Sequence, residues 1–152
     1  MTIRPLADAD VPSLAAGLAA LPLMLRYGRT EARLAADLRA SLARGDGLLV
    51  AEEGGALRGV VWFLRSGTLG MGGYLRLLAV LGGAQGGGTG AALLAAFEAE
   101  VAKASAHAFL LVSDFNDGAQ RFYVRNGYVR VGAMPRLVLP DVDELVFWKR
   151  LR

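Results

Sequence analysis

The sequence predicts a single α/β (α+β) domain with a mixed, mostly antiparallel sheet and helices on both faces. Two observations predict this class: apolar runs of strand length alternate with amphipathic helical stretches, and no linker, repeat or charge block divides the chain. The 152 residues are 54% hydrophobic and 20% charged, which suits a globular domain with a real core. We therefore expect residues 1–152 to form one domain.

The first third of the chain predicts one strand and two helices. Asp8 and Asp10 are both suitable N-caps for the first helix, and Pro22 ends or bends it. Thr30 is the predicted N-cap of the second helix, in which leucines recur at helical spacing. The expected elements are a strand at 2–6, a helix at 11–21, a connection at 23–29 and a helix at 31–44.

The middle of the chain predicts three strands. Residues 60–64 are apolar throughout, which is typical of a strand that is buried on both faces. A glycine pair at 54–55 indicates a hairpin turn, and the glycine-rich stretch at 66–73 is predicted to be a mobile loop. The expected strands are 48–52, 57–64 and 75–80.

The last third of the chain predicts two further helices and three strands. Asn126 and Gly127 form a typical left-handed end to the second of these helices. The expected elements are helices at 91–103 and 116–126 and strands at 108–112, 128–134 and 145–149. The complete predicted order is β-α-α-β-β-β-α-β-α-β-β.

Composition excludes several classes of function. The chain has no cysteine, so disulfides, thiolate metal sites and cysteine nucleophiles are excluded. Its one histidine, His107, precedes an apolar run and is predicted to lie in a surface or loop position, so no metal site is expected. The sequence has no apolar run of membrane-spanning length and no signal-peptide core at its start, which predicts a cytoplasmic protein without membrane contact. The net charge of +3 comes from scattered arginines, so nucleic acid is an unlikely partner.

A glycine-rich turn between a predicted strand and a predicted helix is the first candidate site. Its amides at Gln85, Gly86, Gly87, Gly88, Thr89 and Gly90 precede or open the helix, where unpaired N–H groups and the helix dipole favour phosphate. The turn lacks the lysine that a P-loop carries at the start of its helix, so a P-loop is a poor match. A dinucleotide fingerprint fits Gly86, Gly88 and Ala91, with Asp114 as the ribose carboxylate, although Asp114 lies beyond the usual spacing of about 20 residues. An acyl-coenzyme A is the third ligand class.

A second motif follows one strand later, and it affects the choice among these three ligand classes. It reads Asn116-x-x-Ala119-x-x-Phe122-Tyr123-x-x-x-Gly127-Tyr128. Taken with Gln85-Gly86-x-Gly88-x-Gly90 after Leu78-Ala79-Val80, it resembles the GNAT superfamily of N-acyltransferases over nearly the whole chain. One departure is Gly82, where the family often has proline to stiffen the turn.

The resemblance implies acetyl-CoA, or another acyl-CoA, as co-substrate. The amides from Gln85 to Gly90 would hold its pyrophosphate, and the edge formed by Leu78, Ala79 and Val80 would pair with the pantetheine arm. The N–H of Val80 would also polarise the thioester carbonyl. The resemblance assigns Asn116 and Phe122 to the cofactor arm and Arg125 to the adenine end.

The resemblance also makes Tyr123 the general acid of a direct transfer in a ternary complex. An amine attacks the thioester and a thiolate leaves; thiol and phenol have pKa values of about 8.5 and 10, so proton transfer is nearly balanced. The general base is open between water and the carboxylates of Glu52, Glu53 and Asp114. The expected acceptor is a primary amine of a small molecule or peptide, and Arg26, Tyr27 and Arg29 are candidates to meet an anionic group on it.

Two functions remain open beside N-acetyltransfer. One is a non-catalytic acyl-CoA-binding or interaction domain, and the other is a nicotinamide-dinucleotide-binding domain. A homodimer is also expected, formed through the strands from Val129 onward or through residues 21–25.

Overall fold

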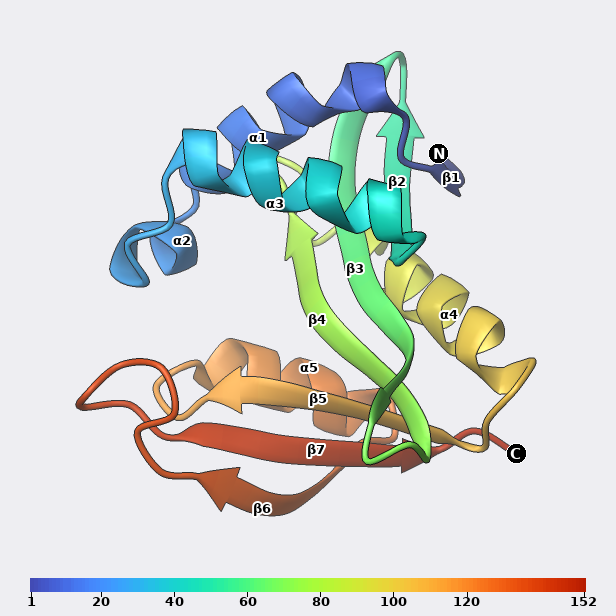
Figure 1. Ribbon diagram of the computed structural model, residues 1–152, viewed down its shortest axis with the longest axis vertical. Helices are drawn as coiled ribbons and strands as arrows, with labels where there is room; N and C mark the ends of the chain where they lie inside the picture. Colours follow the sequence, from blue (N-terminus) through green and yellow to red (C-terminus); the bar gives the residue numbers. More distant parts are fainter. The chain divides into compact units, whose positions relative to one another are not determined.

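The computed structural model describes residues 1–152 and contains a 7-stranded sheet (Figure 1). The strands are β1 (Thr2–Pro5), β2 (Gly47–Glu53), β3 (Ala56–Thr68), β4 (Gly72–Val80), β5 (His107–Ser113), β6 (Val129–Met134) and β7 (Glu144–Arg150). The helices are the short 3₁₀ helix η1 (Asp8–Asp10), α1 (Val11–Ala19), α2 (Pro22–Arg26), α3 (Glu31–Arg44), α4 (Thr89–Ala102) and α5 (Asp117–Arg125).

The strand order is β1-β2-β3-β4-β5-β7-β6. The β4–β5 pair is parallel, whereas β1–β2, β2–β3, β5–β7 and β6–β7 are antiparallel. The predicted α/β class with a mixed, mostly antiparallel sheet is therefore confirmed. The predicted order of elements is also correct, with η1 and α2 as additions.

The chain divides into two compact units. Unit 1 comprises Met1–Phe63 and Leu77–Phe97, and unit 2 comprises Leu64–Arg76 and Glu98–Arg152. This division does not test the expectation that residues 1–152 form one domain, which stays a prediction.

Unit 1 has helices on both faces of its strands. On one face α1 and α3 lie side by side (Figure 1), and their leucines form a cluster with Val60 and Trp62 of β3. Because neighbouring strand residues point to opposite faces, Phe63 lies on the other face. There its ring packs edge-to-face on Phe97 of α4, with ring centroids 5.1 Å apart. The indole N–H of Trp62 donates to Ser41 Oγ at 3.0 Å, so this buried polar group is satisfied.

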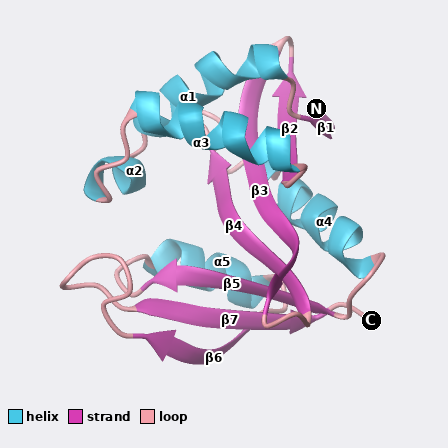
Figure 2. Cartoon of the chain, in the orientation of Figure 1, coloured by secondary structure: helices cyan, strands magenta, loops and turns pink.

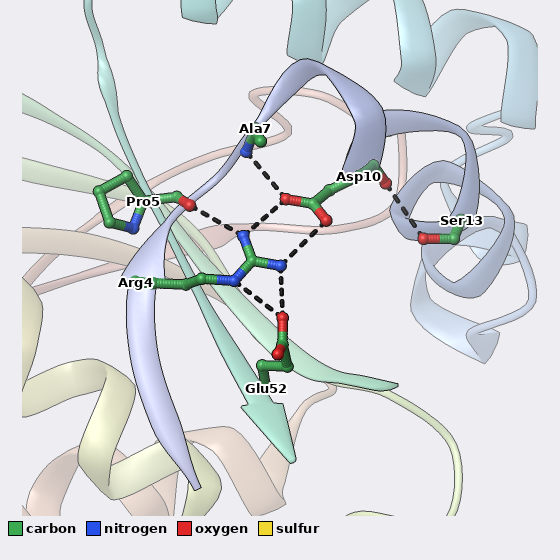
Figure 3. Close-up of polar contacts among 6 residues, drawn as sticks. All are labelled: Arg4, Pro5, Ala7, Asp10, Ser13 and Glu52. Atoms are coloured by element: carbon green, nitrogen blue, oxygen red, sulfur yellow. Dashed lines mark hydrogen bonds and ion pairs between the residues drawn. The ribbon is translucent and has the colours of Figure 1, made fainter. Parts of the chain in front are cut away.

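The beginning of unit 1 is held by one arginine (Figure 3). Arg4 of β1 donates from Nη1 and Nη2 to the carboxylate of Asp10 at 2.7 and 3.0 Å. Its Nε donates to Glu52 Oε2 at 2.8 Å. This guanidinium holds the pKa of Asp10 below its usual value. Arg4 therefore links β1, η1 and β2 within one network of charge-assisted hydrogen bonds.

Unit 2 contains β5, β7 and β6 side by side (Figure 2). Alternate residues of β5 are buried, as are Leu145 and Phe147 of β7. Lys149 Nζ lies 3.0 Å from both carboxylate oxygens of Glu98, and it also sits 5.7 Å from the centre of the Tyr128 ring. This ion pair connects β7 to the second half of α4, which belongs to the same unit.

The glycine-rich stretch at 66–73 was predicted to be a loop, and this prediction is wrong. Most of it extends β3 to Thr68 and starts β4 at Gly72. A Cβ at Gly73 would lie 2.2 Å from Val101 Cγ2, and one at Gly72 would lie 2.5 Å from the carbonyl oxygen of His107. These glycines permit close packing of a strand, which composition alone does not distinguish from flexibility.

Two helix boundaries also differ from the prediction. Pro22 does not end a helix but lies in the first turn of α2. Proline is tolerated there because backbone N–H groups of the first turn have no partner within the helix. The segment at 23–29 was expected to be a connection and is mostly this helix. The helix α4 begins at Thr89, two residues before its predicted start, because Thr89 and Gly90 adopt helical conformation despite the glycine-rich context. None of the helices has the length and apolar character needed to cross a membrane.

Candidate active site

The turn between β4 and α4 depends on glycine for its backbone conformation. Gly83, Gly86 and Gly88 have φ angles of 82°, 82° and 81°. A Cβ at any of them would meet nothing within 4 Å, so the requirement for glycine comes from φ and not from space. The open surroundings leave this backbone accessible to a ligand.

The side chain of Gln85 braces this turn. Its Nε2 donates to the carbonyl of Val80 at 3.2 Å, and its Oε1 accepts from the N–H of Gly83 at 3.2 Å. The turn also holds one backbone bond, from Ala84 N–H to the Leu81 carbonyl at 3.0 Å. The Gln85 side chain is thus used within the turn, and phosphate binding through its backbone amide stays a prediction.

The amides that follow have no acceptor within the chain. Those from Gln85 to Gly88 make no hydrogen bond, and α4 begins directly afterwards at Thr89. Gly59 allows this helix to start close to β3, because a Cβ there would lie 2.9 Å from Leu93 Cδ1. The positive end of α4 and a row of unpaired donors thus converge at the same place, and they fit a phosphate group.

A pocket of about 350 Å³ lies against this turn, entirely within unit 1. It is lined by Met1, Glu53, Arg58, Gly83, Ala84, Gln85, Gly87 and Thr89. Thr89 is buried, and its hydroxyl lies 3.5 Å from Met1 Sδ. Met1 and Arg58 were not predicted, because local sequence does not indicate that the N-terminus and the start of β3 lie beside the turn.

The residues predicted to form an edge for the cofactor arm lie at the end of β4. The β4–β5 pairing involves only Gly73, Tyr74 and Leu75 of β4, so Leu78, Ala79 and Val80 lie beyond it. Leu78 and Val80 are half-buried, whereas Ala79 is 7% exposed and belongs to the core cluster of unit 1. The position of Val80 beyond the pairing is the one that its predicted role requires.

The second motif lies on and before α5, in unit 2. Asn116 is the N-cap, and its Oδ1 accepts from the Ala119 N–H at 3.1 Å. The cap leaves the Nδ2 group of Asn116 to face another partner. Phe122 is half-buried and Arg125 is exposed on the last turn of the helix. The structure brings these residues together with Tyr123 on one short helix, while the turn and Val80 belong to unit 1.

Tyr123 is held by aromatic neighbours. It is 7% exposed, and its ring packs edge-to-face on Phe122 and Tyr128 at centroid distances of 5.1 and 5.7 Å. Burial raises the pKa of the Tyr123 hydroxyl above its ordinary value, because phenolate is poorly solvated there. Tyr123 therefore remains a proton donor across the physiological range.

The three carboxylates considered as general base have other contacts. Glu52 accepts from Arg4, and Asp114 Oδ2 accepts from the Asp143 N–H at 3.1 Å. Glu53 is exposed at the rim of the pocket. Glu144 was not predicted from sequence; it is 7% exposed as the first residue of β7. Its charge contributes to the raised pKa of Tyr74, although burial of that tyrosine is the larger cause.

The remaining candidates have structural contacts. Arg29 Nη2 donates to Asp37 at 2.9 Å, whereas Arg26 and Tyr27 occupy the end of α2 and the residue after it. His107 is the half-buried first residue of β5, where its Nδ1 accepts from the Trp148 indole at 3.0 Å. No group of three or more His, Cys, Asp or Glu side chains is arranged to hold a metal ion.

Solved structures share this fold over nearly the whole chain. A ribosomal-protein-alanine N-acetyltransferase from Brucella melitensis is 19% identical, with a TM-score of 0.76 and coverage of 99% of both chains. An aminoglycoside 6′-N-acetyltransferase complexed with coenzyme A is 19% identical, with a TM-score of 0.81 and coverage of 100% of this chain and 98% of the other. A Salmonella typhimurium protein solved with its cofactor acetyl-CoA is 19% identical, with a TM-score of 0.78 and coverage of 100% and 94%. At these identities the likeness establishes the fold.

The family follows from a sequence match. A search among curated proteins finds no match. The model of the acetyltransferase (GNAT) domain, in contrast, matches residues 30–136, which include the turn, β4 and all of α5. This match confirms the predicted family and the predicted enzyme class, an acyl-CoA-dependent N-acyltransferase. The chain belongs to the acetyltransferase (GNAT) family.

Proposed function

We propose that this protein transfers an acetyl group from acetyl-CoA to a primary amine of a small molecule or peptide. The observation that carries the proposal is the row of unpaired amides from Gln85 to Gly88 at the start of α4. In a member of this family, such a row is suited to the diphosphate of the co-substrate.

The cofactor contacts are divided between side chains and backbone. Amides from Gln85 to Gly90 bind the diphosphate, and the edge from Leu78 to Val80 pairs with the pantetheine arm. Asn116 donates from Nδ2 to this arm, because its Oδ1 is occupied by the helix cap. Phe122 contacts the arm, and exposed Arg125 faces the adenine end.

The chemistry needs one hydrogen-bond donor at the carbonyl and one proton donor at sulfur. Bound acetyl-CoA supplies the thioester carbonyl and the thiolate leaving group. The N–H of Val80 donates to the carbonyl oxygen as negative charge develops there. Tyr123 gives its phenolic proton to the departing sulfur, and burial keeps that proton in place before the reaction. The attacking amine loses its proton to water or to a nearby carboxylate.

The acceptor class rests on what the structural neighbours act on. One of them is named for the alanine of a ribosomal protein and another for an aminoglycoside, which are a peptide amine and a small-molecule amine. Both are amines on otherwise different molecules. This range supports a primary amine as acceptor for the present chain, and a panel of both kinds is the direct way to select between them.

Two measurements test the proposal. A melting screen against acetyl-CoA, CoA, NAD and ATP should give stabilisation by the first two, since a ligand at 100 times its dissociation constant adds about 2.7 kcal/mol. Release of CoA from acetyl-CoA should then depend on an added amine. Stabilisation by NAD alone, weakened in Asp114→Ala, would instead establish a dinucleotide-binding domain. Stabilisation by CoA without transfer to any amine would establish a non-catalytic binding domain.

We also propose a cytoplasmic homodimer. The edge strand β6 exposes Val129, Val131 and Met134, which are 56%, 55% and 47% exposed, and its outer edge has no strand partner. An unpaired edge with apolar side chains favours pairing with the same strand of a second copy. Sedimentation at rising concentration should show a dimer, and a monomer at all concentrations would exclude this arrangement.

A further inference from the structure

Arg58 stands out among the residues that line the pocket beside the turn. It lies near the start of β3, and its Nε atom is buried without a hydrogen-bond partner. The nearest carboxylate oxygen, Glu53 Oε2, is 3.8 Å from this nitrogen. A buried N–H group without an acceptor costs folding free energy, so its persistence calls for an explanation.

Arg4, another arginine of unit 1, behaves differently. Arg4 uses Nε, Nη1 and Nη2 in hydrogen bonds to Asp10 and Glu52, so its guanidinium is fully committed to the fold. Arg58 has only the long contact to Glu53, whose side chain is 61% exposed. A contact of this kind contributes little to stability because water and salt screen it. The fold therefore gives no sufficient reason for a cation at position 58.

Gly83, Ala84, Gln85 and Gly87 of the turn line the same pocket as Arg58. Backbone donors, the positive end of α4 and a guanidinium are thus gathered at one pocket. Such a combination selects an anion with several acceptor oxygens, and arginine matches phosphate with two parallel N–H donors. We propose that Arg58 binds a phosphate group of the acyl-CoA co-substrate, an inference that rests on the proposed function.

Glu53 gives this arrangement a second property. Its carboxylate competes with the phosphate for Arg58 and repels the ligand's charge. Removing the two charges should therefore change cofactor affinity in opposite directions. A purely structural Arg58–Glu53 contact predicts no such opposition, because either substitution would then only remove a weak surface pair.

Calorimetric titration with CoA tests the proposal. Arg58→Ala should weaken CoA binding about tenfold, the usual loss for a charge-assisted hydrogen bond, and Arg58→Lys should fall between it and the wild type. Glu53→Gln should tighten binding roughly twofold, since an exposed charge is screened. Arg39→Ala is the matched control: it removes the same charge from an exposed position on α3 and should leave CoA affinity unchanged.

Dephospho-CoA, which lacks the 3′-phosphate, identifies the group that Arg58 contacts. If Arg58→Ala weakens CoA but not dephospho-CoA, the contact is the 3′-phosphate; if it weakens both equally, the contact is the diphosphate. Both results support the inference. Equal CoA affinity of wild type and Arg58→Ala overturns it while leaving acetyl transfer intact, whereas a wild type that does not bind CoA refutes the proposed function itself. Should Arg58→Ala not fold, unchanged affinity in both Arg58→Lys and Glu53→Gln overturns the inference equally well.

Discussion

The two regions that carry the predicted cofactor contacts are built in opposite ways. The turn from Gly82 to Gly88 is exposed over most of its length and offers amides. Helix α5 offers side chains, and its key residue, Tyr123, is 7% exposed among other aromatic rings. The turn lies between β4 and α4, and α5 follows β5, so both regions occur where a helix follows a strand. They therefore differ in chemistry and not in topology.

This contrast teaches where sequence change is tolerated in each region. Binding of a ligand by backbone amides depends little on side-chain identity, but it depends on the backbone angle φ. Only glycine adopts a positive φ at little energetic cost. A proton donor depends on one atom of one side chain, and its surroundings set its pKa. Substitutions should therefore affect binding in the turn and turnover at Tyr123.

The largest expected effect belongs to Tyr123→Phe. The change keeps the ring and its packing but removes the phenolic proton, so kcat should fall about 10²–10⁴-fold, the usual contribution of a general acid. CoA affinity, measured by titration, should stay as in the wild type. Tyr128→Phe is the matched control, because Tyr128 is also buried against the same ring. Equal losses of kcat in the two variants would remove the special role of Tyr123.

The turn should respond in affinity. Gly86→Ala places a side chain at a φ of 82°, which costs about 1–2 kcal/mol and should weaken CoA binding up to tenfold. Gly82→Ala is the control, since Gly82 has no positive φ and a Cβ there meets nothing within 4 Å. Titration and thermal melting of both proteins distinguish backbone conformation from space. A Gly86→Ala protein that binds CoA normally would show that the turn tolerates the change or does not hold the diphosphate.

Asn116 combines a structural role as a helix cap with a proposed ligand contact. Asn116→Ala removes the N-cap of α5 and should lower the free energy of unfolding by about 1 kcal/mol, measured with urea. Asn116→Asp keeps a capping oxygen but loses the Nδ2 donor, so stability should be retained while KM for acetyl-CoA rises. The Asp variant thus isolates the ligand contact from the cap. An unchanged KM in this variant would leave Asn116 with a structural role only.

The smallest expected effect is an absence of pH dependence. Burial raises the pKa of Tyr123 above its usual value near 10, so the neutral phenol persists as pH rises from 8 to 10. Turnover at saturating substrate should not decline through that interval from loss of the acid. A fall with an apparent pKa below 10 that is absent in Tyr123→Phe would contradict the burial of this hydroxyl.

Much of the fold was predictable because strand and helix periods repeat clearly along the chain. The order of elements along the chain and the caps at Thr30 and Asn116 follow from local sequence, and both caps form the expected side-chain bonds. Local sequence cannot reveal that Gly73 is required by Val101, because that contact joins residues far apart in the chain. The same limit hid the extension of β3 and β4 into the glycine-rich stretch.

The candidate site shows the same division. The turn and α5 were predicted from motifs in which the functional residues are near one another in sequence. Arg58 lies on β3, which precedes both motifs in the sequence. It lines the pocket because β3 is the neighbour of β4 in the sheet. For Gln85 the sequence predicted only a backbone amide at the ligand, whereas its side chain also holds Val80 and Gly83, which the motif did not indicate.

The bridge made by Gln85 has a consequence for how substrate length governs rate. It ties the carbonyl of Val80, whose N–H is proposed to meet the thioester, to the loop proposed to grip the diphosphate. Binding of the diphosphate at this loop would then align the thioester with the N–H of Val80. A shortened thioester such as S-acetylpantetheine should consequently turn over slowly even at saturation, because the missing nucleotide is the part whose binding energy tightens the reacting end.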